Sequence, residues 1–127
     1  MKFFLIFIMI FFHIVDDYYL QGILAKLKQK SWWQENAPDP LYKNDYKMAL
    51  IMHAFSWSFM IMLPLLVYSI VTSGMPYYFH YIFCIIWNTI IHAKVDNDKA
   101  NKHKINLVTD QVIHLIQIAV TYILFIL

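Results

Sequence analysis

Three pairs of histidine and aspartate recur along this chain, each with a spacing of four residues. The pairs are His13 with Asp17, His92 with Asp96 and, in reverse order, Asp110 with His114. A spacing of four places both side chains on one face of a helix, about one turn apart. Neutral imidazole and carboxylate groups are ligands of Zn, Mn and Fe ions, and such sites need no thiolate. The spacing therefore predicts helical metal ligands.

The helices that must position these pairs are expected to span a membrane. The composition is 61% hydrophobic and 14% charged, with a mean hydropathy of +0.53, whereas soluble domains are about 25% charged. Four apolar runs each approach the length of about 17–25 residues that crosses a bilayer. They cover residues 3–20, 48–72, 76–93 and 107–127. The predicted fold is all-α, a four-helix transmembrane bundle that forms a single integral membrane domain over residues 1–127.

The lysines predict the orientation of this bundle. Nine of the ten basic residues lie in the two segments that connect span one to span two and span three to span four. The positive-inside rule places both segments in the cytoplasm, and both termini on the non-cytoplasmic side. An uncharged turn at Ser73–Pro76 joins the second and third spans. We interpret the first apolar run as a membrane span and not as a signal peptide, because no small-x-small cleavage site follows it.

The composition also suggests a source and a location. The chain has no arginine and is rich in lysine, isoleucine and asparagine, which is typical of an AT-rich genome such as that of a low-GC bacterium or a phage. We expect the bacterial inner (cytoplasmic) membrane, with the lipid bilayer as the main partner. The net charge of +2 is too small to indicate nucleic-acid binding. The oligomeric state is left open.

In this orientation the ionisable residues form two layers near the cytoplasmic boundary. Each paired histidine lies deeper than its aspartate, and His53, near the start of the second span, joins the histidine layer. Ionisable groups inside spans are costly, so this matched depth indicates metal or proton chemistry over a purely structural polar core. The predicted ligands of one or two Zn, Mn or Fe ions are His13, Asp17, His53, His92, Asp96, Asp110 and His114.

Other candidate side chains fit this pattern less well. Asp16 points about 100° around the helix from Asp17 and is the weaker ligand. His80 falls near the opposite side of the membrane, and His103 lies in a lysine-rich loop where water is expected to solvate it. Trp57 is interpreted as a packing or lipid-contacting residue.

Several short motifs together carry a family resemblance. They are His13-x-x-x-Asp17-x-x-x-Gln21, Ala25-Lys26-x-Lys28, His53 early in the second span, His92-x-x-x-Asp96-x-x-Lys99, and Asp110-Gln111-x-x-His114. In this respect the chain, from His13 to about Ile118, resembles an uncharacterised bacterial and phage membrane family called domain of unknown function 3307. That family is similar to small membrane-bound metal-dependent hydrolases, which implies a hydrolase. Asp16 departs from the family pattern and leaves the choice between Asp16 and Asp17 as ligand open.

The leading hypothesis is a membrane-embedded, metal-dependent hydrolase of a phosphoester or phosphoanhydride at the cytoplasmic membrane face. His53 would be a metal ligand or an acid–base group, and Lys99 would bind an anionic group of the substrate as a point charge. Gln21 and Gln111 would orient the metal ligands. The substrate would be an anionic lipid headgroup, a lipid-linked phosphate or a nucleotide. The alternatives are a divalent-metal transporter or sensor, and a non-catalytic, phage-type membrane interaction protein with a structural metal.

Overall fold

Each predicted apolar run contains one long helix in its described part. The computed structural model describes residues 2–73 and 78–126, and this part of the chain contains helices and no strand, which confirms the all-α prediction. The long helices are α1 (Lys2–Val15), α4 (Asp45–Ser73), α5 (Tyr78–Ala100) and α6 (Leu107–Ile126). The predicted turn at residues 73–76 lies, apart from Ser73, outside the described residues.

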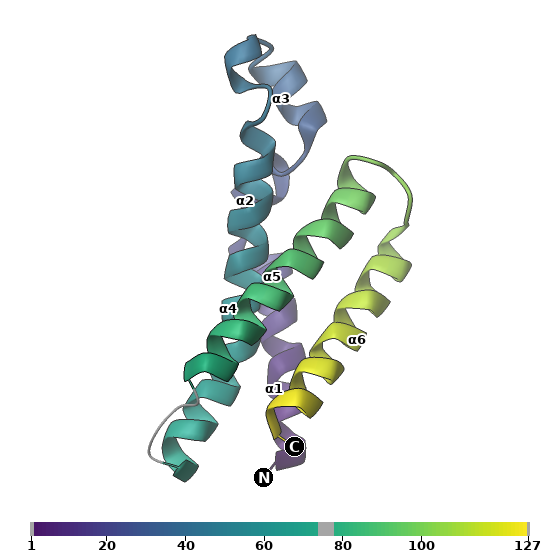
Figure 1. Cartoon of the computed structure of the whole chain (residues 1–127). Helices are drawn as coiled ribbons and strands as arrows, with labels where there is room; N and C mark the ends of the chain where they lie inside the picture. The colour runs from purple at the N-terminus through teal and green to yellow at the C-terminus, as the bar shows by residue number, and fades with distance from the viewer. Residues whose placement is uncertain (1, 74–77, 127) are drawn as a thin grey trace.

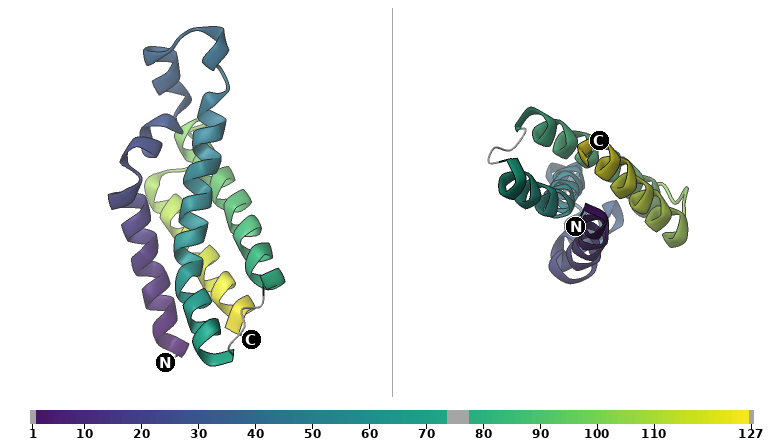
Figure 2. Two further views of the ribbon diagram at one scale, coloured as in Figure 1. Left: turned by 90° about the vertical axis from the view of Figure 1, so that its left-hand side faces the viewer. Right: turned by 90° about the horizontal axis from the view of Figure 1, so that it is seen from below.

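The four long helices lie side by side, and each packs against at least two of the others. Helix α1 contacts α4 and α6, while α5 contacts the same two helices from the other side. The start of α1 and the end of α6 lie at one end of the bundle (Figures 1 and 2). The short helices α2 (Gly22–Leu27) and α3 (Lys30–Asn36) lie at the other end, as does the connection between α5 and α6.

Three helical segments of the described chain are long and apolar enough to cross a membrane. They are Lys2–Leu20, Pro40–Ser73 and Leu107–Ile126, judged by length and composition. Helix α5 is not among them because polar side chains interrupt its apolar sequence, including Asn88, His92 and Lys94. Asn88 and His92 are fully buried and face the other helices, whereas Lys94 is exposed.

The distribution of side chains suits lipid surroundings. Large apolar residues cover the outside, with Phe3 85% exposed and Phe79 93% exposed. Inside, the buried side chains of the described residues include 13 polar and 13 apolar residues. A continuous apolar exterior is unfavourable in water but not in a bilayer, and polar groups of membrane proteins turn toward the bundle interior.

The interior divides into an apolar end and a polar end. Leu5 and Met9 of α1 pack with Ile61 and Leu65 of α4 and with Ile118 of α6 in one cluster of buried side chains. This cluster lies toward the end of the bundle that carries the start of α1.

The last residues of the first predicted span form a π-helix, Asp16–Leu20, which ends at Gln21 with φ −103° and ψ 27°. Such wider turns are frequent at functional sites.

Candidate metal centre

The paired histidines and aspartates meet in the middle of the bundle, toward the end that carries α2 and α3. In every pair a ring nitrogen approaches the carboxylate four residues away. The distances are 3.3 Å from His13 Nδ1 to Asp17 Oδ2, 3.6 Å from His92 Nε2 to Asp96 Oδ2, and 3.4 Å from His114 Nε2 to Asp110 Oδ1. Apart from Asp17, which is slightly more exposed, each of these residues is at most 3% exposed.

One group of possible ligands combines α4 and α5. The Nε2 atoms of His53 and His92 are 3.3 Å apart, and Asp96 Oδ2 lies 2.8 Å from the first and 3.6 Å from the second. Ligand atoms at about 2.0–2.2 Å around a tetrahedral zinc ion are themselves separated by about 3.3 Å. The three atoms therefore have the spacing of one face of such a coordination shell.

A second group combines α5 and α6 and shares Asp96 with the first. His114 Nε2 lies 3.3 Å from Asp96 Oδ1 and 3.4 Å from Asp110 Oδ1, and atoms of all three residues come close enough to hold an ion together. The two oxygens of Asp96 thus face different histidines. A carboxylate in this position can serve either group or connect two neighbouring ions.

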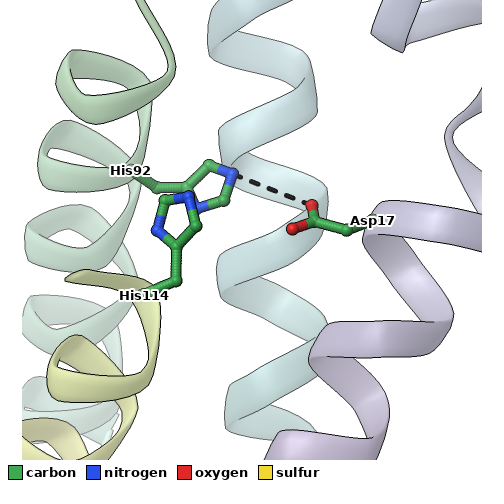
Figure 3. A group of neighbouring side chains, drawn as sticks. All are labelled: Asp17, His92 and His114. Atoms are coloured by element: carbon green, nitrogen blue, oxygen red, sulfur yellow. Dashed lines mark ion pairs between the residues drawn. The ribbon is translucent and has the colours of Figure 1, made fainter. Parts of the chain in front are cut away.

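Asp17 approaches both groups from the α1 side. Its Oδ1 atom lies 4.0 Å from His92 Nε2, and it points toward the stacked rings of His92 and His114 (Figure 3). The same oxygen lies 3.6 Å from His53 Nε2. Asp17, His92 and His114 form a third set of atoms with the spacing needed to hold an ion.

The structure gives the neighbouring residues Asp16 and Asp17 different surroundings. Asp16 is fully buried, but its carboxylate accepts hydrogen bonds from the side-chain amide of Gln21 and, at 2.9 Å, from Ser56 Oγ. Asp17, one residue on, faces the histidines. The π-helical turn therefore directs one carboxylate toward a hydrogen-bonded support and the other toward the candidate metal groups.

Buried carboxylate oxygens without a hydrogen-bond donor indicate that this donor set fits a cation. Asp17 Oδ1 and Asp110 Oδ1 are buried and accept no hydrogen bond from any described residue. Leaving such an oxygen unsatisfied is costly in a region of low dielectric. Imidazole and carboxylate are also the ligand types that Zn, Mn and Fe ions share. The buried groups of histidine and aspartate could hold a metal ion.

Two glutamines hold histidines and aspartates of the cluster in place. Gln21 Oε1 lies 2.6 Å from His53 Nδ1 and can only accept, so this nitrogen carries the proton and Nε2 presents its lone pair to the cluster. Gln111 Oε1 lies 3.1 Å from His13 Nε2, while its amide nitrogen donates to Asp110 Oδ2 at 3.0 Å. Partners of this kind orient the ligands of metal sites.

His13 lies in the layer but has both ring nitrogens engaged outside the candidate metal groups. Trp57 Nε1 donates to His13 Nδ1 at 2.7 Å, and the other nitrogen contacts Gln111 at 3.1 Å. None of the groups found among the described residues includes His13. His13 thus lies beside the candidate metal groups and contacts Gln111, and its role as a metal ligand stays a prediction.

The sequence predicts no role in the cluster for two residues that contact it, Trp57 and Lys28, although Lys28 belongs to a motif of the resemblance. Trp57 is fully buried, bonds to His13 and stacks on His92 with 4.2 Å between ring centroids. Its position four residues after His53 was a usable signal. Lys28 Nζ lies 2.5 Å from Asp96 Oδ2 and 2.9 Å from His53 Nε2. No helical spacing connects Lys28 with these residues, because the helix is interrupted at Gln21, just before α2 begins.

A cavity of about 410 Å³ gives access to the cluster from the end of the bundle that carries α2. Asp17, Asp96 and Asp110 line it together with Lys28, Lys99 and His103. Lys99, predicted to bind an anionic group, lies 2.7 Å from Asp110 Oδ2 through its Nζ atom. The cavity therefore combines carboxylates with positive charges from two lysines, which suits an anionic ligand bound beside a metal ion.

A second polar layer lies one turn further from this cavity, between α5 and α6. Asn88 precedes His92 by four residues, and Gln117 follows His114 by three. Gln117 Nε2 donates to Asn88 Oδ1 at 2.8 Å, and Asn88 Nδ2 donates to Thr121 Oγ1 at 2.9 Å. The polar interior thus continues past the histidines before the apolar cluster begins.

The other histidines lie away from the cluster. His80 is exposed near the start of α5, and His103 is exposed in the connection before α6, where its φ of 52° is left-handed. His103 nevertheless lines the cavity mouth.

No protein-family model, curated protein or solved structure matches this chain.

Proposed function

We propose that this protein is a membrane-embedded, metal-dependent hydrolase of a phosphoester or phosphoanhydride. The observation that carries the proposal is the position of Asp96, whose two oxygens face His53 and His92 on one side and His114 on the other. This arrangement lies beside a cavity lined by two lysines. A cation-binding centre next to positive charges suits a phosphate group that contacts both.

In this proposal all four long helices span the bilayer, and both termini lie on the non-cytoplasmic side. Support comes from the lysine-rich connections, which lie at the end of the bundle that carries the cavity. Helix α5 can be the fourth span because its polar side chains Asn88, His92 and Asp96 are buried against its neighbours. The protein would then reside in a bacterial inner membrane, with the cavity open to the cytoplasm.

The proposed centre takes one or two Zn, Mn or Fe ions. His53, His92, Asp96, Asp110 and His114 would hold them, with Asp17 completing the set from the π-helix Asp16–Leu20. When bound, a divalent ion supplies Lewis acidity that polarises a phosphoryl oxygen and activates water for attack.

The remaining groups of the centre position the ligands and the substrate. Gln21 keeps the Nε2 atom of His53 directed into the cluster, where His53 is a ligand or an acid–base group. Lys99 and Lys28 line the cavity, so their ammonium groups can attract and orient an anionic phosphate. A lipid headgroup, a lipid-linked phosphate and a nucleotide all offer such a group near the membrane surface.

The resemblance to the family of domain of unknown function 3307 is part of this proposal. It is supported by where the motif residues meet, since Gln21 contacts His53 and Lys28 contacts Asp96. Lys99 and Gln111 both contact Asp110. Residues that the resemblance singles out in distant parts of the sequence thus converge on one centre.

The test is hydrolysis by detergent-purified protein supplied with Zn²⁺ or Mn²⁺. The substrates are a phosphomonoester, a phosphodiester, a nucleoside triphosphate and an anionic phospholipid. We expect metal-dependent hydrolysis of at least one substrate, lost in Asp17→Asn and Asp96→Asn. Asp98→Asn is the matched control, because Asp98 lies two residues from Asp96 and pairs with Lys102 instead. Hydrolysis of none of the substrates, or equal activity in all variants, would contradict the proposal.

Transport of a divalent metal is a second candidate, favoured by the layer of Asn88, Gln117 and Thr121. This layer extends the polar interior toward the opposite side of the membrane. Substrate sites of transporters lie near the bilayer midplane. Metal flux into proteoliposomes that disappears in His92→Ala would favour transport, whereas absence of flux with intact metal binding would exclude it.

A further inference from the structure

Lys28 places a positive charge directly on the candidate metal ligands. Its Nζ atom lies 2.5 Å from Asp96 Oδ2 and 2.9 Å from His53 Nε2. Because His53 Nδ1 carries the ring proton and donates a hydrogen bond to Gln21 Oε1, the Nε2 atom offers its lone pair to the ammonium group. Lys28 therefore binds through the same two atoms that His53 and Asp96 would offer to an ion.

A metal ion and the Lys28 ammonium group cannot use these two atoms at the same time. The Nε2 atom of His53 has a single lone pair, so it can bind either the ammonium group, which lies 2.9 Å away, or a metal ion. Two cations at such close range would also repel each other in a buried site of low dielectric. Binding of an ion to this group requires the ammonium group to leave.

The surroundings of Lys28 allow this movement without a change of fold. The backbone carbonyl of Lys28 accepts a hydrogen bond of 3.1 Å from Asn101 Nδ2, which fixes the main chain at the end of α2. The side chain is 15% exposed and lines the cavity of about 410 Å³. Rotation of the flexible side chain into that cavity would release His53 and Asp96 while the backbone stays in place.

We propose that Lys28 is an internal cation that competes with the metal ion for His53 and Asp96 and moves into the cavity when the ion binds. The inference rests on the proposed metal centre and adds its regulation. The apparent dissociation constant for the metal equals the intrinsic constant divided by the fraction of molecules in which Lys28 has left the ligands. The displaced ammonium group would then lie on the cavity wall, where an anionic substrate enters.

The experiment compares the affinity for Mn²⁺ and Zn²⁺ of detergent-purified wild-type protein and the Lys28→Met and Lys28→Ala variants, by titration calorimetry. Neither replacement supplies an oxygen ligand. We expect both variants to bind about tenfold more tightly, as for a wild type with about one tenth of its molecules competent. Lys26→Met is the matched control, because Lys26 is exposed on the same helix, and it should keep the wild-type dissociation constant.

Two further measurements separate direct competition from other effects. In about 1 M salt, where the Debye length is about 3 Å, a long-range charge effect is screened while the gain from removing Lys28 persists. Thermal unfolding of each variant verifies that it is folded.

Wild-type affinity in both folded Lys28 variants, or a gain that vanishes in high salt, would overturn the competition and leave the metal centre intact. Absence of binding in the wild type and in every variant would overturn the proposed function as well.

Discussion

The two halves of the bundle interior are built from the same four helices but from opposite kinds of side chain. Toward the start of α1, Leu5 and Met9 pack with apolar residues of the other helices. Toward α2 the same helices bury His53, His92 and Asp96. Apolar contacts in the first half stabilise the bundle at no cost in desolvation, whereas the second half buries charges that destabilise it unless a cation or hydrogen bonds compensate. We infer that the apolar end stabilises the bundle and that the polar end carries the function.

The largest effect is expected where one carboxylate serves both metal groups. Asp96→Asn should abolish metal binding, because it removes the carboxylate that faces both groups. The loss of affinity should exceed the about 10–100-fold that is typical of residues that only support a ligand. Calorimetric titration with Zn²⁺ checks this. Asp98→Asn should bind as the wild type does, since Asp98 pairs with Lys102 at 2.8 Å and contacts no described ligand. Equal binding by both variants would remove the reason to contrast the two ends.

The apolar half should respond in the opposite way. Leu65→Ala removes a fully buried side chain of α4 and should lower the free energy of unfolding by about 2–5 kcal/mol, because a cavity remains. Denaturant titration in detergent measures this change. Metal affinity should stay within about twofold for the folded protein, since distant sites act independently. Leu124→Ala is the control, because Leu124 is 50% exposed on α6. A loss of metal affinity in Leu65→Ala would show that the halves are coupled.

A Gln21→Ala variant tests whether a hydrogen-bond partner of a ligand contributes to the metal affinity. Gln21→Ala removes the acceptor 2.6 Å from His53 Nδ1 and should weaken metal binding by about 10–100-fold. Gln29→Ala should have no effect, because Gln29 is exposed and its side chain donates to the carbonyl of Ala25, away from the cluster. Metal titrations of both variants make the comparison. An unchanged affinity in Gln21→Ala would mean that His53 is oriented by packing alone.

The smallest effect should mark the border between the two halves. Thr121→Val removes the hydroxyl that Asn88 contacts at 2.9 Å and should lower the free energy of unfolding by about 0.6 kcal/mol, the average for hydrogen bonds inside membranes. Metal affinity should not change. Thr72→Val is the control, because Thr72 is exposed and bonds within its own helix. A weakened metal site in Thr121→Val would extend the functional half to this layer.

Local helix geometry explains which parts of this structure the sequence could predict. The four long helices follow from apolar runs, and the contact between His92 and Asp96 follows from a spacing of four on one helix. Three of the four runs are long and apolar enough to cross a membrane, while the polar residues of α5 lower the mean hydropathy of the fourth.

Local spacing along the sequence could not predict the contacts between different helices. Lys28 reaches Asp96 because the helix is interrupted at Gln21 and α2 packs against α4. His13 shares the spacing of the other pairs, yet Trp57 and Gln111 occupy its ring nitrogens. Spacing along one helix fixes which side chains share a face, whereas the packing of neighbouring helices decides which partner each one meets.

The central claim is that the buried histidines and aspartates bind a metal ion. Elemental analysis of protein purified in detergent without chelator, and then offered Zn²⁺, Mn²⁺ and Fe²⁺ in turn, tests it directly. We predict one or two equivalents of metal per chain in the wild type and in His80→Ala, which changes an exposed histidine of α5, and a loss of metal in His92→Ala. Absence of metal from the wild type, or equal metal in His92→Ala, would contradict the account.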